Sequence, residues 1–119
     1  RALVLRQPHF APAAMRLQFV LNDQVKTAAV RADRVCMVNP GFLDELNVLE
    51  CATLIAHEAL HPELGAFQRI GDRDPRRWNE AQDYVINAIL TRTGLPAIRG
   101  WLRDPRFDGW TDVEIYNHL

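Results

Sequence analysis

The chain has 119 residues, which is enough to bury a core and fits one domain over residues 1–119. Its 48% hydrophobic content and formal net charge of −1 describe an ordinary globular protein and argue against a polybasic surface for nucleic acid. No apolar run approaches membrane-spanning length, and Pro8, His9 and Pro12 interrupt any signal-peptide pattern, so we expect a cytoplasmic protein without a membrane partner.

The first third of the chain has the patterns of β-structure. Residues 15–22 alternate apolar and polar side chains, which predicts a half-buried strand. Residues 25–30 and 35–38 flank the charged segment 31–34, and together they predict a hairpin. Residues 39–41, Asn-Pro-Gly, predict a turn that leads into the helices.

The next segment predicts an amphipathic helix with a clear beginning. Asn47 followed by Glu50 has the spacing of a capping box, and apolar residues then recur at helical intervals. Pro62 removes a backbone donor and disfavours helical geometry in the residue before it. We therefore expect this helix to kink or end at His61.

The most informative motif lies on this helix. His57-Glu58-Ala59-Leu60-His61 places two imidazoles four residues apart, so both rings share one helix face and can converge on one metal ion. This is the HExxH pattern of zinc peptidases, in which the histidines bind Zn²⁺ and the glutamate is the general base. Two solvent-facing histidines with an incidental glutamate are the alternative.

Catalytic zinc takes three protein ligands, so a third ligand is required. A histidine six residues after the second, as in metzincins, would fall at Phe67, which excludes that class. The following helix offers other candidates. It is predicted from Pro75 to Thr93, because Asp74 is a good N-cap and Gly94 a good C-terminal stop.

This second helix has an apolar face and a polar stripe beside it. The apolar face consists of Trp78, Ala81, Val85, Ala88 and Ile89, and the polar stripe of Asn79, Glu80, Asp83 and Asn87. A polar stripe next to apolar residues favours a lined site over a solvated face. Glu80 and Asp83 are one turn apart, and either carboxylate could reach the metal. The segment 79–83 resembles the glutamate-bearing segment of thermolysin-type gluzincins, which favours Glu80.

Two smaller features complete the sequence patterns. Thr111 followed by Glu114 is a second capping box and predicts a short terminal helix. Cys36 and Cys51 have no close spacing and favour reduced, buried thiols over a disulfide. The whole pattern predicts an α+β fold in which a small antiparallel sheet packs against the helix with the HExxH motif and the following helix that bears the third ligand.

A longer resemblance rests on several of these residues together. The matching segments are 38–42, His57 to His61, 73–75, 78–79, Ala81, 83–87, 95–96, 104–107 and 114–116. Over about the last hundred residues the chain resembles a family of bacterial and phage zincin-like metallopeptidase domains. In larger members this domain precedes a von Willebrand factor A-like domain, so the resemblance implies a partner protein in its place.

The resemblance also implies a site. The family's aspartate matches Asp83, whereas its position for Glu80 is commonly apolar, so Asp83 ranks first as the third ligand and Glu80 stays as the alternative. It further implies a zincin-like fold with His57, His61 and Asp83 as zinc ligands and Glu58 as catalytic base.

Three functional readings follow from these expectations. The leading one is a zinc-dependent metallopeptidase that hydrolyses peptide bonds of a peptide or protein substrate, with Glu58 as general base toward a zinc-activated water. An edge strand of the hairpin could hold an extended substrate. The second reading is a non-catalytic zinc-binding or protein-interaction module on the same scaffold. The third is a helical scaffold without metal. No residue can be assigned as oxyanion donor, although Tyr84, Tyr116 and His118 are available.

Overall fold

The computed structural model describes residues 11–119, so the expectations drawn from Pro8 and His9 lie outside the described residues. Within that range three strands, five α-helices and one 3₁₀ turn follow one another along the chain. They are α2 (Ala11–Met15), β1 (Gln18–Leu21), β2 (Ala28–Val30), β3 (Val35–Val38), α3 (Pro40–Asp44), α4 (Val48–Glu63), α5 (Pro75–Arg92), η2 (Pro105–Phe107) and α6 (Asp112–His118). This confirms the prediction of a mixed α+β fold.

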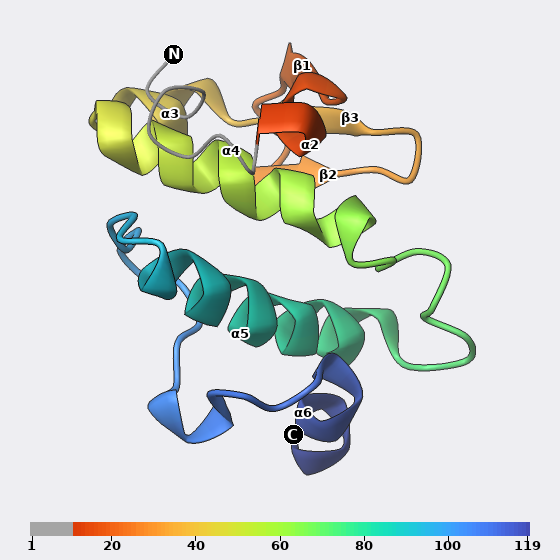
Figure 1. Ribbon diagram of the computed structural model, residues 1–119. Helices are drawn as coiled ribbons and strands as arrows, with labels where there is room; N and C mark the ends of the chain where they lie inside the picture. The colour runs from red at the N-terminus through yellow and green to blue at the C-terminus, as the bar shows by residue number, and fades with distance from the viewer. Residues whose placement is uncertain (1–10) are drawn as a thin grey trace.

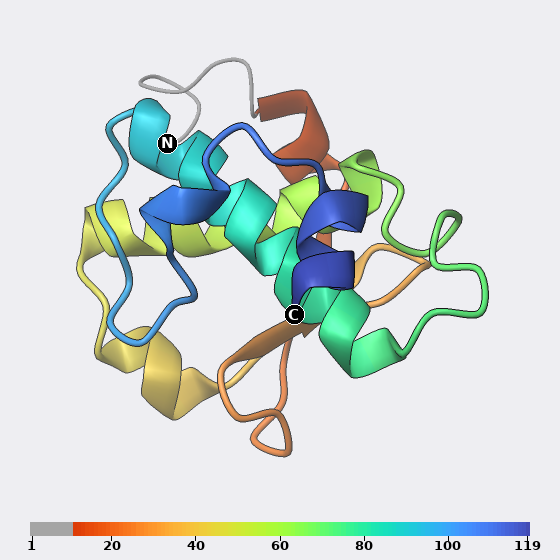
Figure 2. The ribbon, with the colours of Figure 1, turned by 90° about the horizontal axis from the view of Figure 1, so that it is seen from below.

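Helix α4 lies in the middle of the molecule. The sheet and α2 pack on one side of it, and α5 packs on the other (Figure 1). Helix α6 then lies across α5 on the face turned away from α4, as Figure 2 shows from below. The HExxH motif is therefore held between the sheet and a second helix.

The sheet has the order β1-β3-β2. Strands β2 and β3 pair antiparallel, with Ala29 opposite Met37, which confirms the predicted hairpin. Strand β1, however, pairs with the other edge of β3 in parallel, so the prediction of an antiparallel sheet was wrong. The reason is topological. From β1 the chain first forms β2 at the opposite edge of the sheet, and it then returns antiparallel to β2 through the central strand β3, so that β1 and β3 run in the same direction.

The prediction for residues 15–22 was correct in type and wrong in burial. Met15 ends α2, and the strand covers only Gln18–Leu21, in which all four residues are exposed. Leu17, just before the strand, is buried. The pattern identified a strand, but β1 is an edge strand at the margin of the sheet, where the apolar side chains of Phe19 and Leu21 are not covered by the described residues.

Helix α4 begins as predicted. The side chain of Asn47 accepts from the backbone of Glu50 and the Glu50 side chain accepts from the backbone of Asn47, each at 2.9 Å. An end at His61 was wrong, because the helix continues through Pro62 to Glu63, and a kink there stays a prediction. Proline there removes only the bond to the carbonyl of the residue four before it, and the last turn is closed by Leu64, which donates to the carbonyl of Leu60 at 2.9 Å.

The other helix boundaries follow their caps. Asp74 caps α5 by accepting from the backbone of Arg77 at 2.8 Å, and Thr93 is the C-cap, within one residue of the predicted end. The capping box at Thr111 opens α6 as expected. Asn39 does not simply turn the chain: it caps the short helix α3, since its side chain accepts from Phe42 at 3.1 Å and the following proline suits a first helical turn.

Three apolar clusters bury the elements against one another. Ala52 and Ala56 of α4 meet Ile86 and Leu90 of α5, and the small alanines bring the two helices close together. On the other face of α4, a second cluster includes Cys36 and Val38 of the sheet and Leu54 and Ala59 of the helix. The third joins α5 to α6 and contains Trp78, Ala81, Phe107, Ile115 and Tyr116. The close α4–α5 contact determines where their polar side chains meet.

Two further expectations concern the described residues as a whole. Cys36 is buried, Cys51 is partly buried, and both are free thiols, as the spacing predicted. Within residues 11–119, no helix combines the length and apolarity needed to cross a bilayer.

Candidate metal centre

Three side chains from the two central helices converge on one point. His57 and His61 project from α4, and Asp83 projects from α5. Oδ1 of Asp83 lies 3.0 Å from Nε2 of His57 and 2.9 Å from Nε2 of His61, and the two imidazole nitrogens are 3.3 Å apart. Their potential ligand atoms lie within 4.8 Å of one another, so the group could hold a metal ion.

The size of this triangle fits a zinc ion. Tetrahedral zinc with bonds of about 2.0–2.1 Å to nitrogen and oxygen separates its ligand atoms by about 3.3 Å. The separations here, from 2.9 to 3.3 Å, are close to that value. Two imidazole nitrogens and one carboxylate oxygen are also a donor set of catalytic zinc sites, which leave a further position for water. The side chains present therefore fit the ion.

The hydrogen bonds around His57 give a second indication of a cation. Nδ2 of Asn87 donates to the carbonyl of Leu102 at 2.8 Å, which orients the amide, and Oδ1 of Asn87 lies 2.8 Å from Nδ1 of His57. Because that oxygen can only accept, Nδ1 carries the proton and Nε2 of the neutral ring has a free lone pair. That nitrogen faces the carboxylate of Asp83, so either the second proton of an imidazolium or a metal ion belongs between the two atoms.

The charges of the site agree with this. Burial opposes ionisation of Asp83, but hydrogen bonds from His57 and His61 lower the pKa of its carboxyl to about 2. Burial also opposes protonation of His57, yet the hydrogen bond to Asp83 and the charge of Glu58 raise the pKa of the imidazole overall. The cluster thus favours a positive charge in its centre, which in the metal-free protein is a proton.

Glu58 lies beside the cluster without joining it. Its Oε2 is 3.9 Å from Nε2 of His57, beyond hydrogen-bonding distance. The residue is only 6% exposed, and burial raises the pKa of its carboxyl despite the nearby histidines. A buried carboxylate that faces the centre without filling it has the position of a proton acceptor for a small molecule bound there.

The other candidates lie elsewhere. Glu80 is part-exposed and faces Arg76 across one helical turn, with Nε and Oε1 3.7 Å apart, so it does not reach the histidines. Tyr84 packs against Phe107, with ring centroids 5.0 Å apart, and the Tyr116 hydroxyl accepts from the backbone of Asp74 at 2.9 Å. Sequence patterns placed Asn87 on the polar stripe but could not reveal its bond to His57, because nothing local indicates its partner.

Two cavities open at the cluster. The larger, of about 440 Å³, lies between β2, the segment after α4 and the first half of α5. The smaller, of about 220 Å³, lies between α3, α4 and the segment 98–102. His57, Glu58 and Asp83 line both, so the centre is accessible from two sides.

Comparison with known proteins supports the same class of site. A family model described as "Putative metallopeptidase domain" matches residues 1–119. No curated protein and no solved structure matches the chain. The described cluster of two histidines and an aspartate agrees with what that description requires of a metal-dependent enzyme. The chain belongs to this metallopeptidase-domain family.

Proposed function

We propose that this protein is a zinc-dependent metallopeptidase with a zincin-like domain over residues 1–119. His57, His61 and Asp83 would hold the ion, and Glu58 would act as general base. The observation that carries the proposal is the convergence of three ligand atoms from α4 and α5 within 4.8 Å, next to a buried carboxylate. The match to the metallopeptidase-domain family supports it.

The roles of the side chains follow from their positions. Zinc bound here supplies a Lewis acid that lowers the pKa of a water molecule and polarises the scissile carbonyl. Glu58 accepts the proton of the attacking water and returns it to the leaving amine. Asn87 keeps the Nε2 of His57 free for the metal by accepting the proton of Nδ1.

The sheet supplies a place for the substrate backbone. Hydrogen-bonded pairs alternate along an antiparallel ladder, and Asn39 and Arg31 each donate to the opposite strand, at 2.8 and 2.9 Å. The peptide groups of Ala28 and Val30, which lie between those pairs, therefore face the outer edge of β2. No strand of the described residues pairs with that edge, and it lines the larger cavity. An extended peptide can add to it by β-augmentation.

Metal analysis is the first test. The same donor set also binds Fe(II) in oxygenases, so elemental analysis of the purified protein should measure zinc, iron and manganese together. We expect about one zinc per chain, as in other single catalytic zinc sites. Asp83→Ala should lose the ion far more readily than Glu80→Ala, because Glu80 lies with Arg76 away from the cluster. Equal loss in both variants would contradict the assignment of Asp83.

Glu58→Gln separates an enzyme from a binding module. An amide cannot accept the proton of the attacking water, whereas zinc affinity does not depend on this side chain. The variant should therefore keep its fold and its zinc while losing hydrolysis of unfolded proteins and peptide libraries. If the zinc-loaded wild type cleaves nothing, or if Glu58→Gln cleaves as fast as the wild type, the non-catalytic zinc-binding module is the better account.

A further inference from the structure

The two cavities at the metal centre adjoin each other, because they share part of their lining. The larger is lined by β2, residues 66–70 and the first half of α5, and the smaller is lined by Phe42 and residues 98–102. Four residues line both: Thr27, His57, Glu58 and Asp83. A ligand that occupies both cavities would therefore have the candidate metal ligands and the candidate base between its two ends.

Helix α5 runs beside both cavities, so it gives their combined length. Its lining residues run from Pro75 in the larger cavity to Asn87 in the smaller. At a rise of about 1.5 Å per helical residue this stretch spans about 18 Å, which equals about five or six residues of extended chain at about 3.3 Å each. Asp83 stands about two thirds of the way along. The larger side thus has room for three or four residues and the smaller side for about two.

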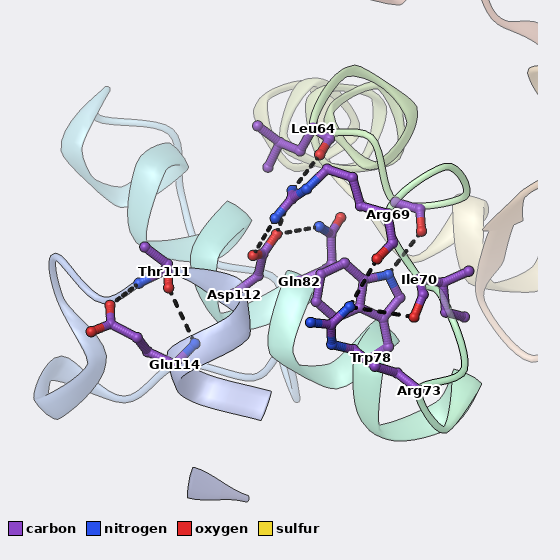
Figure 3. Close-up of polar contacts among 10 residues, drawn as sticks. Leu64, Arg69, Ile70, Arg73, Trp78, Gln82, Thr111, Asp112 and Glu114 are labelled. Carbon is purple, nitrogen blue, oxygen red and sulfur yellow. Dashed lines mark hydrogen bonds and ion pairs between the residues drawn. The ribbon is translucent and has the colours of Figure 1, made fainter. Parts of the chain in front are cut away.

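The wall of the larger cavity is held in place although it has no regular structure. Between α4 and α5, Arg69 donates to the carbonyl of Leu64 at 2.8 Å and forms two bonds with the buried carboxylate of Asp112, at 2.9 and 2.7 Å (Figure 3). The indole nitrogen of Trp78 donates to the carbonyl of Ala66 at 2.8 Å. Gln82 adds a third bond to Asp112 at 2.7 Å. Residues 64–70 are therefore fixed before any ligand binds.

We propose that the substrate is an extended polypeptide that crosses the metal centre with residues on both sides, so that an internal peptide bond is cleaved. This inference rests on the proposed peptidase function and adds that the enzyme is an endopeptidase. The step is hydrolysis: the oxygen of water bonds to the carbonyl carbon, the C–N bond breaks, and the proton passes through Glu58 to the amine. An exopeptidase instead needs a site that ends close to the metal and binds a free terminus.

Peptides with blocked ends distinguish an endopeptidase from an exopeptidase. A pool of randomised ten-residue peptides, N-acetylated and C-amidated, is compared with the same pool carrying free termini, and the products are identified by mass spectrometry. We expect both pools to be cleaved at comparable rates and at internal bonds. Removal of single residues from the free pool alone would overturn the inference while leaving the peptidase function intact.

Binding can be measured without hydrolysis. In zinc-loaded Glu58→Gln labelled with ¹⁵N-tryptophan, the indole signals report separate places: Trp78 lines the larger cavity, Trp101 lines the smaller, and Trp110 lines neither. The blocked peptide pool should shift the signals of Trp78 and Trp101 and leave that of Trp110 unchanged. A shift of only one of the first two would refute a chain that spans the centre. If both shift while the wild type cleaves neither pool, spanning binding stands and the peptidase function fails.

A matched pair of variants locates the contact. Phe67 lines the larger cavity and is 37% exposed, whereas Trp110 is 38% exposed and lies away from both cavities. Because Trp110 also packs against Phe107 and His118, both alanine variants are first checked for an intact fold by circular dichroism. Phe67→Ala should weaken peptide binding to zinc-loaded Glu58→Gln by about tenfold, the loss of one aromatic anchor, and Trp110→Ala should not. Equal affinities in the two variants would place the peptide outside the larger cavity.

Discussion

Asn87 offers the most specific test of the metal centre, because it acts on a ligand without touching the ion. Its side chain is 1% exposed and bridges His57 to the carbonyl of Leu102. Asn87→Leu removes both hydrogen bonds at similar volume. The His57 ring then loses the partner that keeps the proton on Nδ1 and holds the ring plane, so a neutral ring can place its proton on Nε2, where it blocks the metal.

The size of the effect can be worked out from these contacts. One hydrogen bond contributes about 0.5–1.5 kcal/mol, and freeing a side chain that must be immobilised on binding costs about 0.5–1.5 kcal/mol more. Together they predict zinc affinity weakened by about 10- to 100-fold, the range for loss of a partner that orients a metal ligand. Asn87→Asp keeps an oxygen opposite Nδ1 and should restore most of that affinity.

The loss of a buried hydrogen bond also destabilises the fold, so a control is required. Thr53 is fully buried on α4, and its hydroxyl donates to the carbonyl of Pro96 at 2.8 Å, in the same segment that contains Leu102. Thr53→Val therefore removes a buried hydrogen bond to the same segment, from α4 instead of α5, without altering His57. Both variants should lose about 1–3 kcal/mol of metal-free stability in urea unfolding, the cost of a carbonyl left unsatisfied.

The assay is competition for zinc with a chromophoric chelator, together with ¹⁵N shifts that report the tautomer of His57. Only Asn87→Leu should bind zinc more weakly and show a proton on Nε2 in the metal-free protein. If Thr53→Val weakens zinc binding as much, or if Asn87→Leu binds like the wild type, the positioning role of Asn87 is wrong.

Two further predictions concern other parts of the fold. Arg69→Met should destabilise the protein by about 1–3 kcal/mol in urea unfolding, because it leaves the buried carboxylate of Asp112 without its cationic partner. As a control, Arg106→Met removes an exposed ion pair and should change stability by no more than about 0.5 kcal/mol. Equal losses in the two variants would contradict the role of the buried carboxylate. Burial and the charge of Glu58 raise the pKa of the Cys36 thiol from 9.0 to about 12, so the unfolded chain ionises first and stability should fall as pH rises from 9.0 toward 12. Cys36→Ala should remove part of this fall in pH-dependent unfolding, and an unchanged slope would refute the assignment.

The helices of the site could be predicted from the sequence because their signals are local. Capping residues lie three positions from the groups they bind, and ligands four residues apart share a helix face whatever surrounds the helix. Asn47, Asp74 and Thr111 therefore located three helix starts correctly. The bonds that a capping residue or a HExxH helix needs are within the segment itself.

The sheet was predicted less well because strand partners are distant in sequence. The hairpin of β2 and β3 has a short connection, and its antiparallel pairing followed from that. Nothing local in β1 could reveal that it pairs with β3 in parallel or that its apolar side chains stay exposed. Alternation reports the two faces of a strand, but the neighbours decide which face is covered.

The amino-acid sequence by itself determined that two histidines share one face of a capped helix and that a second capped helix carries several polar candidates. Only the packing of α5 on α4 decided among them, because the small side chains of Ala52 and Ala56 let the helices approach and turn Asp83 to the histidines. The same packing left Glu80 beside Arg76 and gave His57 its partner Asn87. A metal site joins residues that are far apart in the chain, so its last ligand, its orienting amide and its cavities exist only once the helices are packed.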